Sequence, residues 1–595
     1  MLKKKFRICP PIKTIENIKY TLDKFEIIVK EKQWWNKNTL HVPCSVSLKL
    51  HKLPFFSYGK GITSNYALAS AYGEIMERIQ NFNMLNLHFG LNESDNHYLK
   101  ATDRKISDNS LIMKWRQLKI ASTEVINAIA DIYKEKKVHA VKYFHVNTGN
   151  IEYLPEYITT ICTGSNGMCS GNTIEEALVQ GLCEILERFI LQKLYDAESL
   201  ELPCISEKVL KTKPSLYNYY TKIRKFGYDL LVKDCSLGGK YPVVGIVIKK
   251  GELATFNLGS APTFEVALER CFTEILQATN IGDLKKILSS AKSVVSFNRK
   301  QKSIYWKTQL NKSYSSYSGT VKSNLLKIDN YINDKIQFFY FSGKTIHDTL
   351  ENILSIFAKN KWQIYIRDSS YLGFPAFHIY VPHVSQVGSV VRKDIVFASQ
   401  LPQAISTMLS LGVATMSEIK ALIETINYFI KQHELFTGKK DSDAILMFKF
   451  LQIPKVIDVN INVISSNIIL CFLYFYLEKY YKALEMLYQE IKSNGKSSSR
   501  KIVVNCLKDI IAIKIKNKKY SRKEILQKYK KKYSEDMCLE VFEVLQKPQL
   551  LSDYLIKLKQ RYENRNIVPF CLKLQKNINK FSFDQLLLQK TVRFS

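Results

Sequence analysis

The sequence predicts an α+β fold in which sheets pack against amphipathic helices, followed by an all-helical C-terminal domain. Strand-like and helix-like segments alternate over residues 1–415, whereas strand signals fade over residues 416–595. Three helices of the first part repeat one pattern of apolar and acidic residues. A chain of 595 residues is also too long for one small core, so we expect two domains, 1–415 and 416–595.

The three repeated helices are predicted from segments that resemble one another. Each begins with Ala-Leu and has Glu-Ile seven residues after the alanine, and its apolar residues recur at helical spacing. The segments are "ALASAYGEIMERIQNF" from Ala67, "ALVQGLCEILERFILQ" from Ala177 and "ALERCFTEILQATNIG" from Ala267. Their offsets of 110 and 90 residues are too long for a solenoid repeat, so we expect related helices inside one domain.

Four strand-like runs accompany these helices. They are rich in β-branched and aromatic residues and are bounded by turn formers. The runs are "HAVKYFHV" at 139–146, "YPVVGIVIKK" at 241–250, "ATFNLGSA" at 254–261 and "AFHIYVP" at 376–382. We therefore expect sheets packed against the three helices.

Two further regions are assigned from composition and periodicity. Residues 283–345 are polar, rich in Lys and Ser and weakly periodic, which predicts a loop-rich insertion. From residue 416 onward helical patterns dominate, and "YYKALEMLYQEI" at 480–491 resembles one helix of a tetratricopeptide pair. We therefore predict a tetratricopeptide-like C-terminal domain that binds partners, and we assign it no chemistry.

The charge of the chain bears on its partners. Its formal net charge of +33 attracts phosphate, yet the excess of lysine runs through the whole sequence, so direct nucleic-acid binding is not favoured. The most basic segment, "KIKNKKYSRKEILQKYKKKY" at 514–533, is interpreted as a charged helical face, with RNA or an acidic partner as the alternative.

The compartment is predicted from cysteine usage and hydropathy. Twelve cysteines are scattered without a Cys-x-x-Cys pair, which indicates free thiols in a reducing cytoplasm and does not support a zinc site. No signal-peptide core follows the basic amino terminus. The apolar run at 463–481 is interrupted by polar residues, so we interpret it as a buried helix and expect no membrane span.

The repeated helices place carboxylates at equivalent positions. If the helices converge, their glutamates form a crowded acidic group, which is costly unless cations neutralise it. The glutamates are Glu74, Glu77, Glu184, Glu187 and Glu274. Carboxylate oxygens without His or Cys suit Mg²⁺, which usually binds together with substrate phosphates, so the pattern indicates a nucleoside triphosphate site.

Basic residues accompany these glutamates. We expect Arg78 and Arg188 to pair with glutamates of their own helices, while Arg270 either does the same or grips phosphate. Two glycine-containing segments, "YGKGIT" at 58–63 and "SLGGKY" at 236–241, each carry a lysine and are interpreted as hairpin turns, with a phosphate contact as the alternative. No P-loop or Rossmann signature occurs.

Three of these segments together resemble the nucleotide-site motifs of the YcaO family. They are "GKGITSNYALASAYGEIMER", "SNGMCSGNTIEEALVQGLCEILER" and "ALERCFTEILQ", in the family's order and with similar spacing. The resemblance extends to about residue 415, through "KDCSLGGKYPVVGIVI" and "YLGFPAFHIYVP". With its helical C-terminal domain the chain is similar to the long, stand-alone branch, which includes an accessory factor for methylthiolation of a ribosomal small-subunit protein.

The resemblance implies a YcaO-type catalytic domain that binds ATP and Mg²⁺. The metal ligands it implies are Glu74, Glu77, Glu184, Glu187 and Glu274. The nucleotide contacts it implies are Gln180, Arg270 and Glu274, together with Lys13 and Asn17 from a looser match in an amino-terminal helix. It also implies a homodimer.

The family's chemistry implies phosphorylation of a backbone amide oxygen after a nucleophile has added to the carbonyl carbon. Phosphate then leaves and an azoline, thioamide or amidine remains. Because this chain ends "LLLQKTVRFS" instead of in a proline-rich tail, we expect amide activation with an external partner, or an accessory role, rather than azoline formation by this chain alone.

Three functions follow as hypotheses. The first is an ATP- and Mg²⁺-dependent enzyme that activates a polypeptide amide, or that supports methylthiolation of a ribosomal protein with a methylthiotransferase or a peptide-recognition partner. The second is a cyclodehydratase or thioamide-forming enzyme of a ribosomally made natural-product pathway. The third is a nucleotide-regulated scaffold that binds ribosome or RNA without turnover.

Overall fold

The structure is a computed structural model, and it describes most but not all of the chain. The described residues are 7–50, 56–81, 104–106, 108–135, 138–156, 158–159, 162–196, 202–290, 323–326, 331–332, 339–387, 392–437, 450, 465–493, 498–516, 521–563 and 585–592.

The chain divides into two units at a point that the sequence pattern does not mark. Unit 1 comprises Met1–Phe89, His97–Ile395 and Lys573–Ser595, and unit 2 comprises Gly90–Asn96 and Val396–Leu572. The division falls inside one helix, α11 (Arg392–Leu409), about 20 residues before the boundary expected at residue 415. Ile395 is buried with the core of unit 1, whereas Met408 is buried with the helices that follow. Helical periodicity continues across this point, so composition and pattern do not reveal it.

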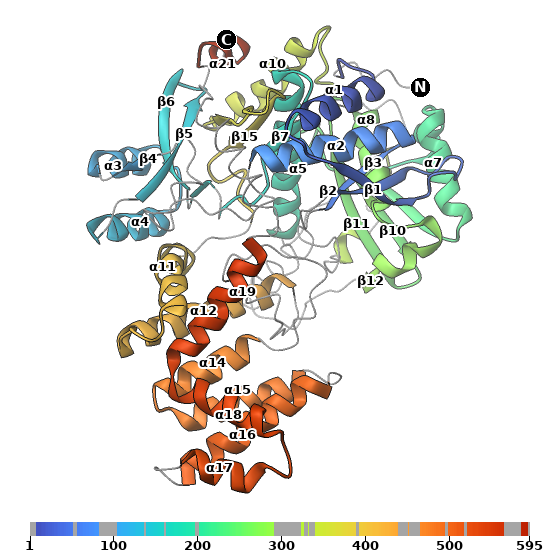
Figure 1. Cartoon of the computed structure of the whole chain (residues 1–595). Coiled ribbons are helices and arrows are strands. Elements are labelled where there is room, and N and C mark those ends of the chain that lie inside the picture. The colour runs from blue at the N-terminus through green and yellow to red at the C-terminus, as the bar shows by residue number, and fades with distance from the viewer. Residues whose placement is uncertain are drawn as a thin grey trace. The chain divides into compact units, whose positions relative to one another are not determined.

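The described residues of unit 1 form three sheets (Figure 1). The first has the order β1 (Val29–Trp35), β2 (Cys44–Leu50) and β3 (Phe56–Gly61). The second has the order β12 (Ser289–Ser290), β11 (Leu253–Ser260), β10 (Val243–Lys250), β9 (Asp229–Asp234), β8 (Cys204–Ile205) and β13 (Tyr331–Ile332). The third has the order β4 (Arg104–Ile106), β5 (Val138–His145), β14 (Tyr365–Asp368), β15 (Ala376–Tyr380) and β7 (Met168–Ser170), and β6 (Asn150–Pro155) also pairs with β5.

The four predicted strands are found as β5, β10, β11 and β15, within two residues of the expected bounds. The interpretation of residues 58–63 as a hairpin turn is wrong, because residues 58–61 continue β3. The segment 236–241 does form the turn of an antiparallel hairpin, between β9 and β10.

The helices of unit 1 cover these sheets. They are α1 (Pro11–Lys24), α2 (Ser64–Gln80), α3 (Asn109–Gln117), α4 (Thr123–Glu135), α5 (Ile174–Asp196), α6 (Glu207–Lys211), α7 (Pro214–Lys225), α8 (Phe264–Ile275), α10 (Ile346–Lys359) and α21 (Gln585–Thr591), with 3-10 turns η3 (Ile281–Ile287) and η4 (Ser323–Leu326). α1 lies beside α2, and α5 packs against α10, β7, β15 and β11 (Figure 1). The three predicted repeat helices are α2, α5 and α8.

Each repeat helix follows directly on a strand that packs tightly against its first turns. The alanine of each copy donates its backbone N–H to the carbonyl of a threonine four residues earlier, at 3.0–3.1 Å. A glycine on the preceding strand, or directly after it in the case of Gly171, faces this alanine so closely that an added Cβ would lie within 2.6 Å of the alanine backbone. The pairs are Gly59 with Ala67, Gly171 with Ala177 and Gly259 with Ala267. The repeat therefore encodes a strand-to-helix unit in which small residues bring helix and strand together.

Most of the predicted insertion at 283–345 lies outside the described residues. Its described parts are the end of η3, the short strands β12 and β13, η4 and residues 339–345. β12 and β13 are the two edge strands of the second sheet.

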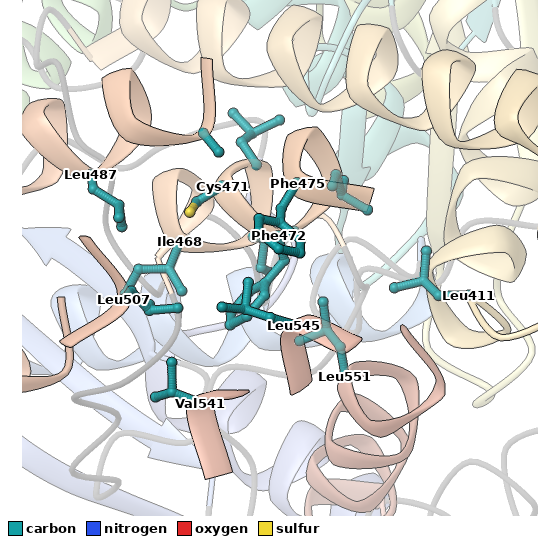
Figure 2. Packing of buried hydrophobic residues seen from close by; sticks show 14 of the residues in the cluster. Leu411, Ile468, Cys471, Phe472, Phe475, Leu487, Leu507, Val541, Leu545 and Leu551 are labelled. Atoms are coloured by element: carbon teal, nitrogen blue, oxygen red, sulfur yellow. The ribbon is translucent and has the colours of Figure 1, made fainter. Parts of the chain in front are cut away.

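In the described part of unit 2, all of the regular elements are helices. Its helices after α11 are α12 (Met416–Thr437), α14 (Ser466–Tyr476), α15 (Tyr480–Ser493), α16 (Ser498–Lys516), α17 (Arg522–Tyr529), α18 (Glu535–Gln546) and α19 (Pro548–Glu563). Figure 2 shows their shared core, in which Leu411, Phe472, Leu507 and Leu551 take part. α14 packs against α15, and α15 against α16. That these helices form tetratricopeptide pairs stays a prediction.

The long apolar run of unit 2 is two helices rather than one. α14 ends at Tyr476, where Glu478 adopts a left-handed backbone with φ of 59° and the N–H of Lys479 bonds to the carbonyl of Tyr474. This left-handed C-terminal turn reverses the chain into α15. Within the described residues, no helix is long and apolar enough to cross a membrane.

The last described helix, α21, belongs to unit 1, although the sequence places residues 585–591 in the C-terminal domain. Leu588 and Val592 are buried in a core cluster with residues of β5, α5 and α10. The side chains of Gln585 and Gln589 both donate to the carbonyl of Gly149, at 3.0 and 2.8 Å. A short apolar segment does not reveal by itself which core it joins, and here the complementary surface decides.

Candidate functional site

A cavity of about 300 Å³ in unit 1 brings the three repeat helices together. All five predicted metal ligands line it, and so do Gln180 and Arg270; the five glutamates are Glu74, Glu77, Glu184, Glu187 and Glu274. Glu74 and Glu274, which lie 200 positions apart in the sequence, thus line the same cavity. Lys13 and Asn17 are not among the lining residues; Lys13 is exposed on α1, where it pairs with Glu16 at 3.5 Å. α1 contributes Pro11 and Thr14 to the lining instead.

α2 supplies Glu74 and Glu77, which differ in their surroundings. Glu74 Oε2 accepts hydrogen bonds from Ser57 Oγ at 2.9 Å and from the N–H of Tyr58 at 2.8 Å, so β3 fixes the direction of this carboxylate. Glu77 is buried, with 8% of its surface exposed. Burial raises its pKa strongly, the neighbouring guanidinium of Arg78 opposes this shift, and the charge of Glu184 adds to it.

α5 supplies Glu184 and Glu187 one turn apart. Burial raises the pKa of Glu187; Arg188 opposes the shift and Glu184 adds to it. Both raised values have the same cause, since carboxylates withdrawn from water and placed near one another disfavour the charged form.

The arginines divide into two roles. Arg78 Nε lies 3.4 Å from Glu77 Oε1 and 3.7 Å from Glu74 Oε1, which confirms the predicted pairing with its own helix. Arg270, on α8, donates from Nη1 to the carbonyl of Ser260 at 2.7 Å, so the end of β11 fixes this side chain at the cavity wall.

Lys60 is the lysine of the segment interpreted as a hairpin turn, and it lies on β3 in the cavity lining. Its Nζ forms an ion pair with Glu274 Oε2 and donates to Gln277 Oε1 at 3.0 Å. Burial lowers its pKa to about 8, against the opposing charges of the cavity glutamates.

The sequence analysis did not identify Arg7 and Glu176, which also line the cavity. Arg7 donates from Nη1 to Glu176 Oε1 and from Nη2 to Gln180 Oε1, both at 2.7 Å. Glu176 also accepts from Asn172 at 3.3 Å. Glu176 and Gln180 are one helical turn apart, a spacing that marks one face of α5. No local motif contains Arg7, because it lies 169 residues from Glu176 in sequence.

The charges of the lining residues test whether the cavity fits Mg²⁺ and a nucleotide. Among the described residues, seven glutamates and five lysine or arginine residues line it, which leaves two formal negative charges in a partly buried space. Oxygen donors suit Mg²⁺, which needs only one or two carboxylates when phosphates and waters complete its coordination. Among the described residues no three acidic, His or Cys side chains form a ready metal cluster. The donor set therefore fits a magnesium ion that binds with phosphate, and not an all-protein metal cage.

The fold and the cavity define an α+β protein with a carboxylate-lined, phosphate-compatible site formed by three related helices. Residues 58–385 match the family described as YcaO cyclodehydratase, ATP- and Mg²⁺-binding, which is more than half of the chain. The chain belongs to the YcaO family, and its cofactors are those of the family, ATP and Mg²⁺.

The individual relatives share less than 30% of the aligned residues with this chain. The chain is 29% identical over 361 residues to an uncharacterized protein of Haemophilus influenzae, covering 58% of this chain and 59% of that protein. It is 28% identical over 348 residues to the ribosomal protein S12 methylthiotransferase accessory factor YcaO of Escherichia coli, covering 56% of this chain and 58% of that protein. The matches thus span less than two thirds of either relative. A solved heterocyclase in complex with substrate and cofactor aligns at 16% identity with a TM-score of 0.42, covering 64% of this chain and 54% of that chain.

Proposed function

We propose that this chain is an ATP- and Mg²⁺-dependent enzyme that activates a backbone amide of a polypeptide. The supporting observation is that α2, α5 and α8, which start at residues 64, 174 and 264, direct five glutamates into one cavity with an excess of negative charge. After a nucleophile has added to the carbonyl carbon, ATP with Mg²⁺ would donate a phosphoryl group to the amide oxygen and leave as ADP. The oxygen, otherwise a very poor leaving group, would then depart as phosphate.

In this proposal the carboxylate ligands of Mg²⁺ are drawn from Glu74, Glu77, Glu184, Glu187 and Glu274, while phosphates and waters complete its coordination. Gln180 and Arg270 orient the nucleotide, and Arg270 contributes a guanidinium fixed by β11. Glu74 is already oriented by β3, so part of the site is arranged before a ligand arrives, which is the condition for effective electrostatic stabilisation. Lys13 and Asn17, which do not line the cavity, contribute to nucleotide binding in this proposal only if α1 moves.

The polypeptide is proposed to come from outside the chain. The 28% identity to the accessory factor of Escherichia coli favours a ribosomal protein as the polypeptide and a methylthiotransferase as partner. A homodimer is part of the same proposal.

The proposal is tested by calorimetric titration of the full chain with AMPPCP, with and without Mg²⁺. Glu184→Ala should abolish Mg²⁺-dependent binding, because it removes a carboxylate from the centre of the acidic group. Glu175→Ala is the matched control, since Glu175 lies on the same helix but not in the cavity lining. Circular dichroism should show both variants folded.

Two results would contradict the proposal. One is a folded wild-type chain that binds no nucleotide in Mg²⁺. The other is equal binding by Glu184→Ala and Glu175→Ala. ATP turnover that rises on addition of a ribosomal-protein peptide would extend the test to the polypeptide.

A further inference from the structure

Lys60 has an unusual place for a lysine, on strand β3, which packs closely on helix α2. Its two neighbours, Gly59 and Gly61, pack so closely on α2 that an added Cβ on either would lie within 2.5 Å of the backbone at Ala67. The alternation of β3 then directs Lys60 to the other side, where it lines the cavity.

The charged end of Lys60 lies among the proposed metal ligands. Nζ is paired with Glu274 Oε2, and Gln277 Oε1 accepts a second bond at 3.0 Å. Gln277 is itself held by the carbonyl of Tyr58, to which its Nε2 donates at 3.2 Å. The contact between β3 and α8 is therefore built from both side chains and backbone.

The charges that face Lys60 come from every repeat helix. α8 contributes Glu274, α2 contributes Glu74, and α5 contributes Glu187, Glu184 and the opposing Arg188. A single ammonium thus sits among four carboxylates of the five proposed as metal ligands. A cation in this place competes with Mg²⁺ for the same oxygens, because two positive charges repel at short range.

We propose that Lys60 is a built-in counter-cation that occupies the site in the absence of Mg²⁺ and gives up Glu274 when the metal binds. This inference rests on the proposed function, since it takes the cavity to be a Mg²⁺ site. It adds a role that the glutamates do not have: Lys60 weakens binding of metal alone, so that tight loading requires nucleotide phosphates as well.

The expected effect is on metal affinity in the absence of nucleotide. Lys60→Met keeps the length of the side chain but removes the competing charge, so it should bind metal about tenfold more tightly than wild type. Lys60→Arg keeps the charge and should stay within about threefold of wild type.

The experiment uses the full chain, stripped of metal with EDTA and dialysed. Mn²⁺ is the probe: free Mn²⁺ is measured by electron paramagnetic resonance during titration, and Mg²⁺ is then added as competitor. Lys240→Met is the matched control, because Lys240 is an exposed lysine next to glycines in the β9–β10 turn and lies outside the cavity lining. If Lys60→Met does not fold without metal, Lys60→Gln replaces it, since Gln retains hydrogen-bond donors without a charge.

Three results are distinguishable. Tighter Mn²⁺ binding by Lys60→Met or Lys60→Gln, with Lys60→Arg and Lys240→Met like wild type, supports the inference. Metal binding by wild type with no gain in the uncharged variants overturns the role of Lys60 and leaves the Mg²⁺ site intact. If neither wild type nor the uncharged variants bind Mn²⁺, even after AMPPCP is added, both the inference and the proposed function on which it rests are overturned.

Discussion

The return of the chain end to unit 1 makes a quantitative prediction at Leu588. Its side chain is 1% exposed and packs in a core cluster with Val146 and Val592. Replacing a buried leucine by alanine typically costs about 2–5 kcal/mol, and a short helix at the edge of a core belongs at the low end of this range. About 2 kcal/mol of lost docking energy corresponds to roughly thirtyfold faster hydrogen exchange, if α21 exchanges by local detachment.

The assay is hydrogen–deuterium exchange followed by mass spectrometry of the peptide that contains residues 585–592. Leu588→Ala should exchange about thirtyfold faster there, while peptides of unit 2 stay unchanged. Leu587→Ala is the matched control on the same helix, because 46% of Leu587 is exposed. Equal rates in Leu588→Ala and wild type, or the same acceleration in Leu587→Ala, would refute the docking of α21 on the core of unit 1.

Two further predictions concern close packing and pH. Gly59→Ala places a Cβ against the backbone carbonyl of Ala67, so it should lower the free energy of unfolding by about 1–3 kcal/mol or prevent folding. Gly282→Ala is the control, because its Cβ enters open space and should change the free energy of unfolding by less than about 0.5 kcal/mol. Urea unfolding measures both variants, and equal stabilities would contradict the close packing of Gly59 on Ala67. His145 is buried between Gln363 and Thr148, and burial lowers its pKa below the usual value of 6.5. The contribution of this neutral imidazole to the free energy of unfolding is fully present above pH 6.5 and is lost as the pH falls through the lower pKa of the folded state. The free energy of unfolding changes by at most about 1.4 kcal/mol per pH unit over this range. His145→Gln should therefore show a smaller fall in melting temperature between pH 7.5 and 5.5 than wild type, and an identical fall would argue against a titrating role.

Much of the site could be predicted because its residues lie in a repeated local pattern. Glu74, Glu184 and Glu274 occupy equivalent positions after Ala-Leu, and helical spacing places Glu77 and Glu187 on the same faces. The structure shows that all five line one cavity. The repeat could not reveal the close contact between the alanine of each helix and a glycine on or directly after the preceding strand, because that contact depends on the distance between two elements.

Other residues of the cavity were beyond local reasoning. Arg7 reaches Glu176 across 169 residues, and no local motif distinguishes it from the surface charges of a chain rich in lysine. Lys60 was interpreted as the lysine of a turn, with a phosphate contact as the alternative, and its ion pair with Glu274 could not be predicted. Only their position relative to the buried carboxylates assigns them to the cavity.

By itself, the sequence determined the elements whose signals are local: the three acidic helices, four strands and the helical character of the C-terminal region, each set by periodicity and side-chain type. Tertiary structure alone decided which elements share a core and a cavity. It placed the unit boundary inside α11, returned α21 to unit 1 and excluded Lys13 and Asn17 from the cavity lining. The physical reason is that periodicity specifies which face of a helix is apolar or acidic, whereas the partner of that face is selected by shape and charge complementarity between segments distant in sequence.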